Sequence, residues 1–251
     1  MEKFAANLTF LFTELPVLQR FEAARRAGFT GVELLFPYDL SARDLARAAQ
    51  TNGLDFVLLN APPPNWTGGA RGFAADPVQS DRFRSDFRRT LRFAQALNAK
   101  HIHIMSGIAQ GTGAHDTFIE NLAWACAEAP DASLIIEPQN SDDMPGYFLS
   151  DFDLAAEVIG TVGAPNLGLQ FDSYHAHRIT GDVIGCWQRH AALIRHVQIS
   201  GHPGRHEPDR GDFDLDAFMN ALREDGYQGW IGAEYTPAAG TLAGLGWLPK
   251  H

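Results

Sequence analysis

Four acidic residues, each near the end of a short apolar run, are the part of this sequence best suited to chemistry. They are Glu33, Glu137, Asp172 and Glu234. If the runs are strands that end at one place, the carboxylates converge, and two such charges about 4 Å apart repel by on the order of 4 kcal/mol. Either some of the acids are protonated or a cation lies among them. Oxygen ligands suit a hard divalent ion, so we expect Mg²⁺ or Mn²⁺.

Positioning these acids requires a scaffold of strands, and the sequence supplies eight candidate runs. Amphipathic segments with helical spacing separate the runs, and strict alternation of strand and helix predicts parallel strands joined by crossover helices. Eight such units predict a closed (β/α)8 TIM barrel as one domain over residues 1–251. A doubly wound sheet that binds a dinucleotide would need a Gly-rich loop after its first strand, and this sequence has none. The predicted strands cover residues 4–10, 31–36, 54–60, 100–107, 133–138, 167–173, 195–200 and 229–235.

Residues that favour helix ends flank the amphipathic segments. Ser41, Ser150 and Asp214 are candidate N-caps, and Gly28, Gly53 and Gly226 are candidate helix ends. His175 and His177 are expected to lie in a loop between a strand and a helix.

Every predicted strand carries a polar residue near its end, where the active site of a TIM barrel lies. His101 and His103 share one face of their strand and are expected to fill a polar layer inside the barrel. The residues at the strand ends are Asn7, Glu33, Asn60, His103, Glu137, Asp172, Gln198 and Glu234.

The overall composition limits the partners of the chain. A formal net charge of −10 disfavours nucleic acid. The two cysteines, Cys126 and Cys186, lie in segments that look helical, are expected to be packing residues, and fit a cytoplasmic setting. No apolar run reaches the length of a membrane span or a signal segment, so no membrane partner is expected, and a homo-oligomer is left open.

Blocks spread over the whole chain resemble the hydroxypyruvate isomerase family, which includes 2-oxo-tetronate isomerase, within the xylose isomerase-like TIM barrels. The blocks are FAANLTFLFTELP, GVELLFPYD, IHIMSG, LIIEPQN, LQFDSYHA, HVQISGHPGRHEPD, YQGWIGAEY and LAGLGW, in that order. The resemblance implies a metal-dependent isomerase without an organic cofactor, which acts on a small anionic oxo acid.

The resemblance also implies roles for particular residues. Glu137, Asp172, Gln198 and Glu234 would be the metal ligands, and Glu137 and Glu234 would also be the catalytic acid/base pair. Such a pair can remove a proton beside a carbonyl group and return one to the neighbouring carbon, through an enediolate. The candidates for substrate binding are Arg205, His175, His202, Glu33 and Asn7.

Several alternatives stay open from the sequence. The substrate is hydroxypyruvate, giving tartronate semialdehyde, or a four-carbon 2-oxo-tetronate. A metal-dependent phosphodiesterase of the apurinic endonuclease kind is a different class of enzyme on a related barrel, and a barrel that only binds is a third. Residues 61–77, which include Trp66, form either a lid over the site or a packed surface loop.

Overall fold

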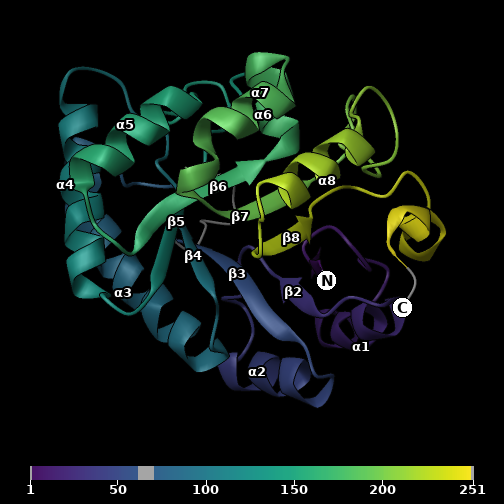
Figure 1. Ribbon diagram of the computed structural model, residues 1–251. Coiled ribbons are helices and arrows are strands. Elements are labelled where there is room, and N and C mark those ends of the chain that lie inside the picture. The colour runs from purple at the N-terminus through teal and green to yellow at the C-terminus, as the bar shows by residue number, and fades with distance from the viewer. Residues whose placement is uncertain (1, 62–70, 250–251) are drawn as a thin grey trace.

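Eight parallel strands close into a barrel in which neighbouring strands follow the order of the chain (Figure 1). This computed structural model describes residues 2–61 and 71–249. Pairing of the first strand with the last, from Lys3 opposite Trp230 to Ala6 opposite Ala233, closes the barrel. The strands are β1 (Lys3–Asn7), β2 (Gly31–Glu33), β3 (Asp55–Ala61), β4 (His101–Ile104), β5 (Ser133–Ile136), β6 (Leu167–Asp172), β7 (Ile194–Ile199) and β8 (Trp230–Ala233).

Helices surround the barrel and cover its outer face, as Figure 1 shows. The fold is therefore the predicted TIM barrel. The α-helices are α1 (Val17–Ala27), α2 (Ala42–Thr51), α3 (Ser80–Leu97), α4 (Gly113–Glu128), α5 (Phe152–Val162), α6 (Ser173–Thr180), α7 (Val183–His190) and α8 (Leu215–Glu224). Three short 3₁₀ helices complete the described elements: η1 (Pro77–Gln79), η2 (Ala191–Leu193) and η3 (Thr241–Trp247).

Two apolar clusters stabilise the barrel. The larger one fills the space between strands and helices, where Phe171 of β6 packs on Trp187 of α7 and Phe218 of α8. The smaller one is separate from it and contains Ala5, Val57, Leu58, Ile135 and Trp230, which come from β1, β3, β5 and β8. Both predicted packing cysteines, Cys126 in α4 and Cys186 in α7, are buried free thiols.

The structure corrects three local expectations. β1, β2 and β4 end three residues earlier than predicted, at the last residue of each that pairs with a neighbouring strand. The N-cap of α5 is Asp151, whose carboxylate accepts from the main-chain N–H of Leu154 at 2.8 Å, and not Ser150. His175 and His177 lie in helix α6 rather than in a loop. This helix begins where Asp172 accepts from the N–H of Tyr174 at 2.8 Å.

The predicted helix ends agree with the structure elsewhere. Ser41 and Asp214 cap α2 and α8 through their side chains, and Gly28 ends α1 in the left-handed conformation. The proposed lid, residues 61–77, lies largely outside the described residues, as does Trp66. No helix within residues 2–61 and 71–249 is long and apolar enough to cross a membrane.

Candidate active site

A cavity of about 140 Å³ lies at the carboxyl ends of the strands and is the candidate active site. Glu137 follows β5 directly and Glu234 follows β8 directly, and both line this cavity. His175 of α6 and Arg205, from the segment between β7 and α8, line it too. Asn60 and His103, which the sequence places at strand ends, line it as well. The other lining residues are not candidates from the sequence: Phe10, Leu35, Phe36, Arg71, Met105, Gln139, Asp143, Met144 and Gln170.

Arg205 joins two of the acids. Its Nη2 donates to Oδ2 of Asp172 at 2.7 Å and to Oε1 of Glu234 at 2.6 Å. Arg205 holds a left-handed backbone with φ of 53°, which costs a residue other than glycine about 1 kcal/mol or more. The main-chain N–H of Thr236 donates to the carbonyl of Arg205 at 2.9 Å and so holds this conformation. This left-handed backbone conformation of Arg205 places its guanidinium beside Asp172 and Glu234, at the ends of β6 and β8.

The acids of the cavity resist ionisation. Burial, followed by the nearby charges of Asp172 and Glu234, raises the pKa of Glu137 well above its ordinary value. Burial also raises the pKa of Glu234, although Arg205 acts in the opposite direction. Burial lowers the pKa of Arg205, but Asp172, Glu234 and Glu137 together outweigh it, so the net shift is upward. Carboxyl groups that hold protons near neutral pH can act as general acids as well as bases.

Glu33 lies deeper in the barrel and joins three polar side chains. Its Oε1 lies 2.6 Å from Nε2 of His196, and its Oε2 accepts from Nε2 of Gln198 at 2.7 Å and from Nδ2 of Asn7 at 3.1 Å. Burial raises the pKa of Glu33 to about 8, although the hydrogen bonds from Gln198 and Asn7 lower it. A protonated Glu33 fits all three contacts, because its O–H can donate to His196 while the other oxygen accepts two bonds. Asn7 extends this network to Glu234, to whose Oε2 it donates at 2.9 Å.

The polar layer predicted for His101 and His103 is present inside the barrel. The ring of His101 on β4 lies 5.5 Å from that of His196 on β7, between strands that are not neighbours. His103 contacts Oδ1 of Asn60 at 3.3 Å and lies 3.7 Å from Oε2 of Glu137. Burial lowers the pKa values of His101, His103 and His196 to about 3, so all three rings are neutral at neutral pH.

The hydrogen bonds of His175 fix its tautomer. The main-chain N–H of Asn140 donates to Nδ1 of His175 at 3.1 Å, so Nδ1 is the acceptor and the ring proton is on Nε2. This Nε2 lies 3.8 Å from Oδ2 of Asp172. Although Glu137, Asp172 and His175 bring ligand atoms within 4.8 Å of one another, a protonated Nε2 cannot bind a metal. His175 is instead placed to donate a hydrogen bond into the cavity.

The oxygen atoms of the site fit a divalent cation. Glu137 Oε1 and Gln170 Oε1 are buried acceptors with no hydrogen-bond partner among the described residues. If the three carboxyl groups of Glu137, Asp172 and Glu234 were ionised, Arg205 would neutralise one of their charges. Two negative charges would be left, and a divalent cation would balance them. Gln198 Oε1 accepts from Nε2 of Gln170 at 2.7 Å and keeps a second lone pair.

The predicted site residues fall into three groups. Glu137, Glu234, His175 and Arg205 line the cavity, and Asp172 is joined to it through Arg205. The network around Glu33, Asn7 and Gln198 supports the cavity from beneath. His202 lies apart from the lining residues, with its ring stacked 4.1 Å from that of His177.

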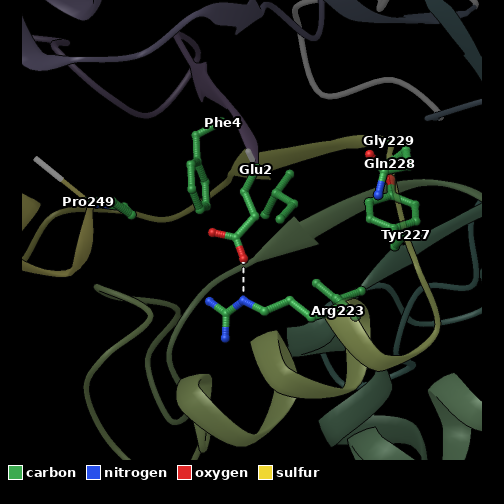
Figure 2. Close-up of a pocket in the computed structure, with 9 residues that line it drawn as sticks. Glu2, Phe4, Arg223, Tyr227, Gln228, Gly229 and Pro249 are labelled. Atoms are coloured by element: carbon green, nitrogen blue, oxygen red, sulfur yellow. Dashed lines mark hydrogen bonds and ion pairs between the residues drawn. The ribbon is translucent and has the colours of Figure 1, made fainter. Parts of the chain in front are cut away.

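Another pocket, of about 360 Å³, lies at the opposite end of the barrel (Figure 2). It is lined by Glu2, which precedes β1, by Arg223 of α8 and by residues 227–229, which precede β8. Its charged groups already pair, since Arg223 Nε donates to Glu2 Oε1 at 2.6 Å (Figure 2). This end of a TIM barrel is associated with stability rather than catalysis, so the cavity beside Glu137 remains the candidate site.

Comparison with known proteins identifies the family of this barrel. Residues 21–251 match the family model described as xylose isomerase-like TIM barrel. A 2-oxo-tetronate isomerase from Cupriavidus necator is 44% identical over 257 residues, covering 100% of this chain and 99% of the relative. A hydroxypyruvate isomerase from Escherichia coli is 37% identical over 257 residues, with 100% of each chain covered. The chain belongs to the hydroxypyruvate isomerase family.

Membership of this family confirms the resemblance predicted from the sequence and makes the chain an isomerase. A solved structure described as an AP endonuclease, family 2, from Brucella melitensis is 40% identical and has a TM-score of 0.95, with 98% of each chain covered. This chain therefore has nearly the same fold as a solved protein whose description names a different activity.

Some lining residues outside the predicted set could be found only from the structure. Arg71 and Gln139 lie outside the strands and helices, where the sequence has no periodic pattern. The alternation of residues along β6 does give one usable signal, since Gln170 lies two residues before Asp172 on the same face of its strand.

Proposed function

We propose that this isomerase interconverts hydroxypyruvate and tartronate semialdehyde by proton transfer between neighbouring carbons, with Glu137 and Glu234 as the acid/base pair. The observation that carries the proposal is the pair of buried carboxyl groups with raised pKa values, at the ends of β5 and β8, that line one small cavity. Its volume of about 140 Å³ is well below the range of roughly 300–1,000 Å³ for drug-sized ligands, which suits a short oxo acid.

In this mechanism one glutamate removes a proton from the carbon beside the substrate carbonyl. The other glutamate donates a proton to the neighbouring carbon, so the reaction passes through an enediolate with no net change in protons. His175 holds its Nε2 proton toward the cavity and can donate it to a substrate oxygen. Arg205 keeps Glu234 and Asp172 in place through its two hydrogen bonds.

The site would also hold a divalent cation, Mg²⁺ or Mn²⁺. Glu137, Asp172, Gln198 and Glu234 are the proposed ligands, and the buried Oε1 of Glu137, which has no hydrogen-bond partner among the described residues, supports the assignment. When bound, such an ion would stabilise the negative charge that develops on the substrate oxygens.

The substrate carboxylate needs a cation that is not already committed. Arg205 already pairs its charge with two carboxylates of the protein, Asp172 and Glu234. Arg71 lines the same cavity and has no ion pair within the part of the chain that the structure describes. We assign the substrate carboxylate to Arg71, which can bind it with two parallel hydrogen bonds, with Arg205 alongside.

The four-carbon 2-oxo-tetronate is the alternative substrate, because relatives with either name cover the whole chain. Assays of both compounds, with product identified by NMR, separate the two. Glu137→Gln and Glu234→Gln should each lower kcat by at least about 10²-fold, as expected when a general acid or base is removed. Glu157→Gln, which changes an exposed carboxylate on α5, is the control and should retain activity. The acid/base assignment fails if either active-site variant retains near-normal turnover.

Phosphodiester hydrolysis is a second candidate, supported by the relative described as an AP endonuclease. A DNA duplex would be repelled on average by a net charge of −10. Salt-dependent binding to abasic DNA, together with cleavage that requires Glu137, would favour this activity over isomerisation.

A further inference from the structure

Three side chains able to bind a metal meet beside the active-site cavity without lining it. His177 lies on α6, and His202 and Asp212 lie on the segment between β7 and α8. Their ligand atoms all lie within 4.8 Å of one another. The two imidazole rings stack with centroids 4.1 Å apart and an angle of 27° between their planes. This trio is separate from the acids at the strand ends.

The backbone brings His202 and Asp212 together. The main-chain N–H of Asp212 donates to the carbonyl of His202 at 2.6 Å. Between them, Gly211 has φ of 82°, and a Cβ at this position would lie 1.8 Å from the carbonyl oxygen of His202. Only glycine permits so close an approach, so this segment folds back on itself and fixes the two ligands before any ion arrives.

The side chains of the trio have unused binding capacity. Nδ1 of His202 is buried and has no hydrogen-bond partner in the described part of the chain. Oδ2 of Asp212 lies 3.7 Å from this nitrogen, and its side chain is 70% exposed, so it is free to move closer. The neighbouring cation on α6, Arg178, already pairs with Asp142, which reduces its repulsion of a bound ion.

We propose that His177, His202 and Asp212 bind one transition-metal dication of the Zn²⁺ class. Two imidazoles and one carboxylate are ligands that Zn²⁺ accepts, at about 2.0–2.2 Å from the metal. Water would complete the coordination, since Asp212 faces solvent. Because the atoms already lie within 4.8 Å of one another, rotation of the side chains is enough to reach these distances.

The bound ion would tie the segment between β7 and α8 to α6. This segment also carries Arg205, three residues after His202, and Arg205 holds Asp172 and Glu234. The ion would therefore restrict the motion of the segment that positions the cavity acids. This inference stands independently of the substrate and of the reaction proposed for the cavity.

Zn²⁺ alone, added to the protein after removal of metals, tests the proposal. Histidine side-chain ¹⁵N NMR should show the signals of His177 and His202 changing together as one equivalent of Zn²⁺ binds. His177→Gln and Asp212→Asn should each weaken this binding at least about tenfold. His206→Gln is the matched control, because His206 lies in the same segment, contacts the carbonyl of Thr236 at 2.8 Å and belongs to no such trio among residues 2–61 and 71–249.

Circular dichroism should show that each variant is folded. Zn²⁺ that binds only at the cavity acids would leave the His177 and His202 signals unchanged and would overturn the proposal. The proposal is also overturned if His177→Gln binds Zn²⁺ as tightly as the wild type, or if His206→Gln weakens Zn²⁺ binding as much as His177→Gln does.

Discussion

Glu33 offers the sharpest test of how the barrel interior is held together. It is fully buried, and its carboxyl group contacts His196, Gln198 and Asn7 at 2.6, 2.7 and 3.1 Å. If Glu33 is protonated, Glu33→Gln reproduces all three contacts, because an amide also offers one donor and one acceptor oxygen. At pH 7 the wild type keeps a proton on folding that its unfolded chain has lost, so we expect the free energy of unfolding of Glu33→Gln to exceed that of the wild type by about 3 kcal/mol, a difference that shrinks as the pH falls toward 4.5.

Glu33→Ala has a different expected outcome. It leaves the partners of three contacts without Glu33, at about 1–3 kcal/mol for each unsatisfied group, and opens a cavity. Relative to Glu33→Gln, which also lacks the titrating proton, a loss of about 3–6 kcal/mol is expected, a large share of the roughly 5–15 kcal/mol by which most domains are stable. Urea unfolding followed by circular dichroism measures both variants.

The pH dependence provides the second readout for Glu33. A carboxyl pKa raised from 4.5 in the unfolded chain to about 8 contributes stability at low pH that is lost as pH rises through 8. Between pH 6 and pH 9 the wild type should lose about 2.5 kcal/mol from this group, whereas Glu33→Gln has no such proton to lose. The difference between the two unfolding curves isolates Glu33, and Glu157→Gln serves as the control for replacing a carboxylate by an amide.

Two outcomes would refute this account of Glu33. Parallel stability curves for the wild type and Glu33→Gln from pH 6 to pH 9 would show that Glu33 is ionised throughout. Equal stability of Glu33→Ala and Glu33→Gln would show that its hydrogen bonds contribute little to folding.

Three further predictions concern the barrel packing and the cavity. Gly232→Ala would place a Cβ 2.1 Å from Oε1 of Glu33 and should lower the free energy of unfolding in urea by about 1–3 kcal/mol. Gly160→Ala is its matched control in α5: a Cβ there would meet nothing within 4 Å, and the free energy of unfolding should rise by about 0.5–1 kcal/mol. Arg205→Met removes the cation that lowers the pKa of Glu234, so the acidic limb of the kcat/KM pH profile should move upward by about one unit or more. Arg71→Met should raise KM for an oxo acid more than it lowers kcat, and an unchanged KM would remove Arg71 from substrate binding.

The sequence predicts the barrel because the alternation of a strand pattern with a helix pattern is repeated along the whole chain. Eight apolar runs alternate with amphipathic segments, and the acids at their ends reach one mouth only in a closed sheet. Helix α6 escapes prediction because its start depends on the Asp172 side chain, which the sequence presents as the end of a strand.

Contacts between distant residues set the limit of sequence reasoning at the site. Glu33 and His196 are 163 positions apart, and nothing local in either segment indicates that they touch. The left-handed backbone of Arg205 depends on the N–H of Thr236, which follows β8, whereas Arg205 precedes α8. Arg71 lines the cavity through the path of a loop, which carries no periodic signal.

Isomerisation in deuterated water under single turnover tests most directly whether Glu137 and Glu234 transfer a proton. With hydroxypyruvate or 2-oxo-tetronate as substrate, the account predicts deuterium at the carbon that receives the proton, detected by NMR of the product, and no turnover in Glu137→Gln or Glu234→Gln. Repeating the turnover with substrate deuterated at the donor carbon identifies a shielded glutamate that returns its own proton. Complete retention of that deuterium, with no label from solvent and with turnover in both glutamine variants, would contradict the proton-transfer pair and indicate a hydride shift.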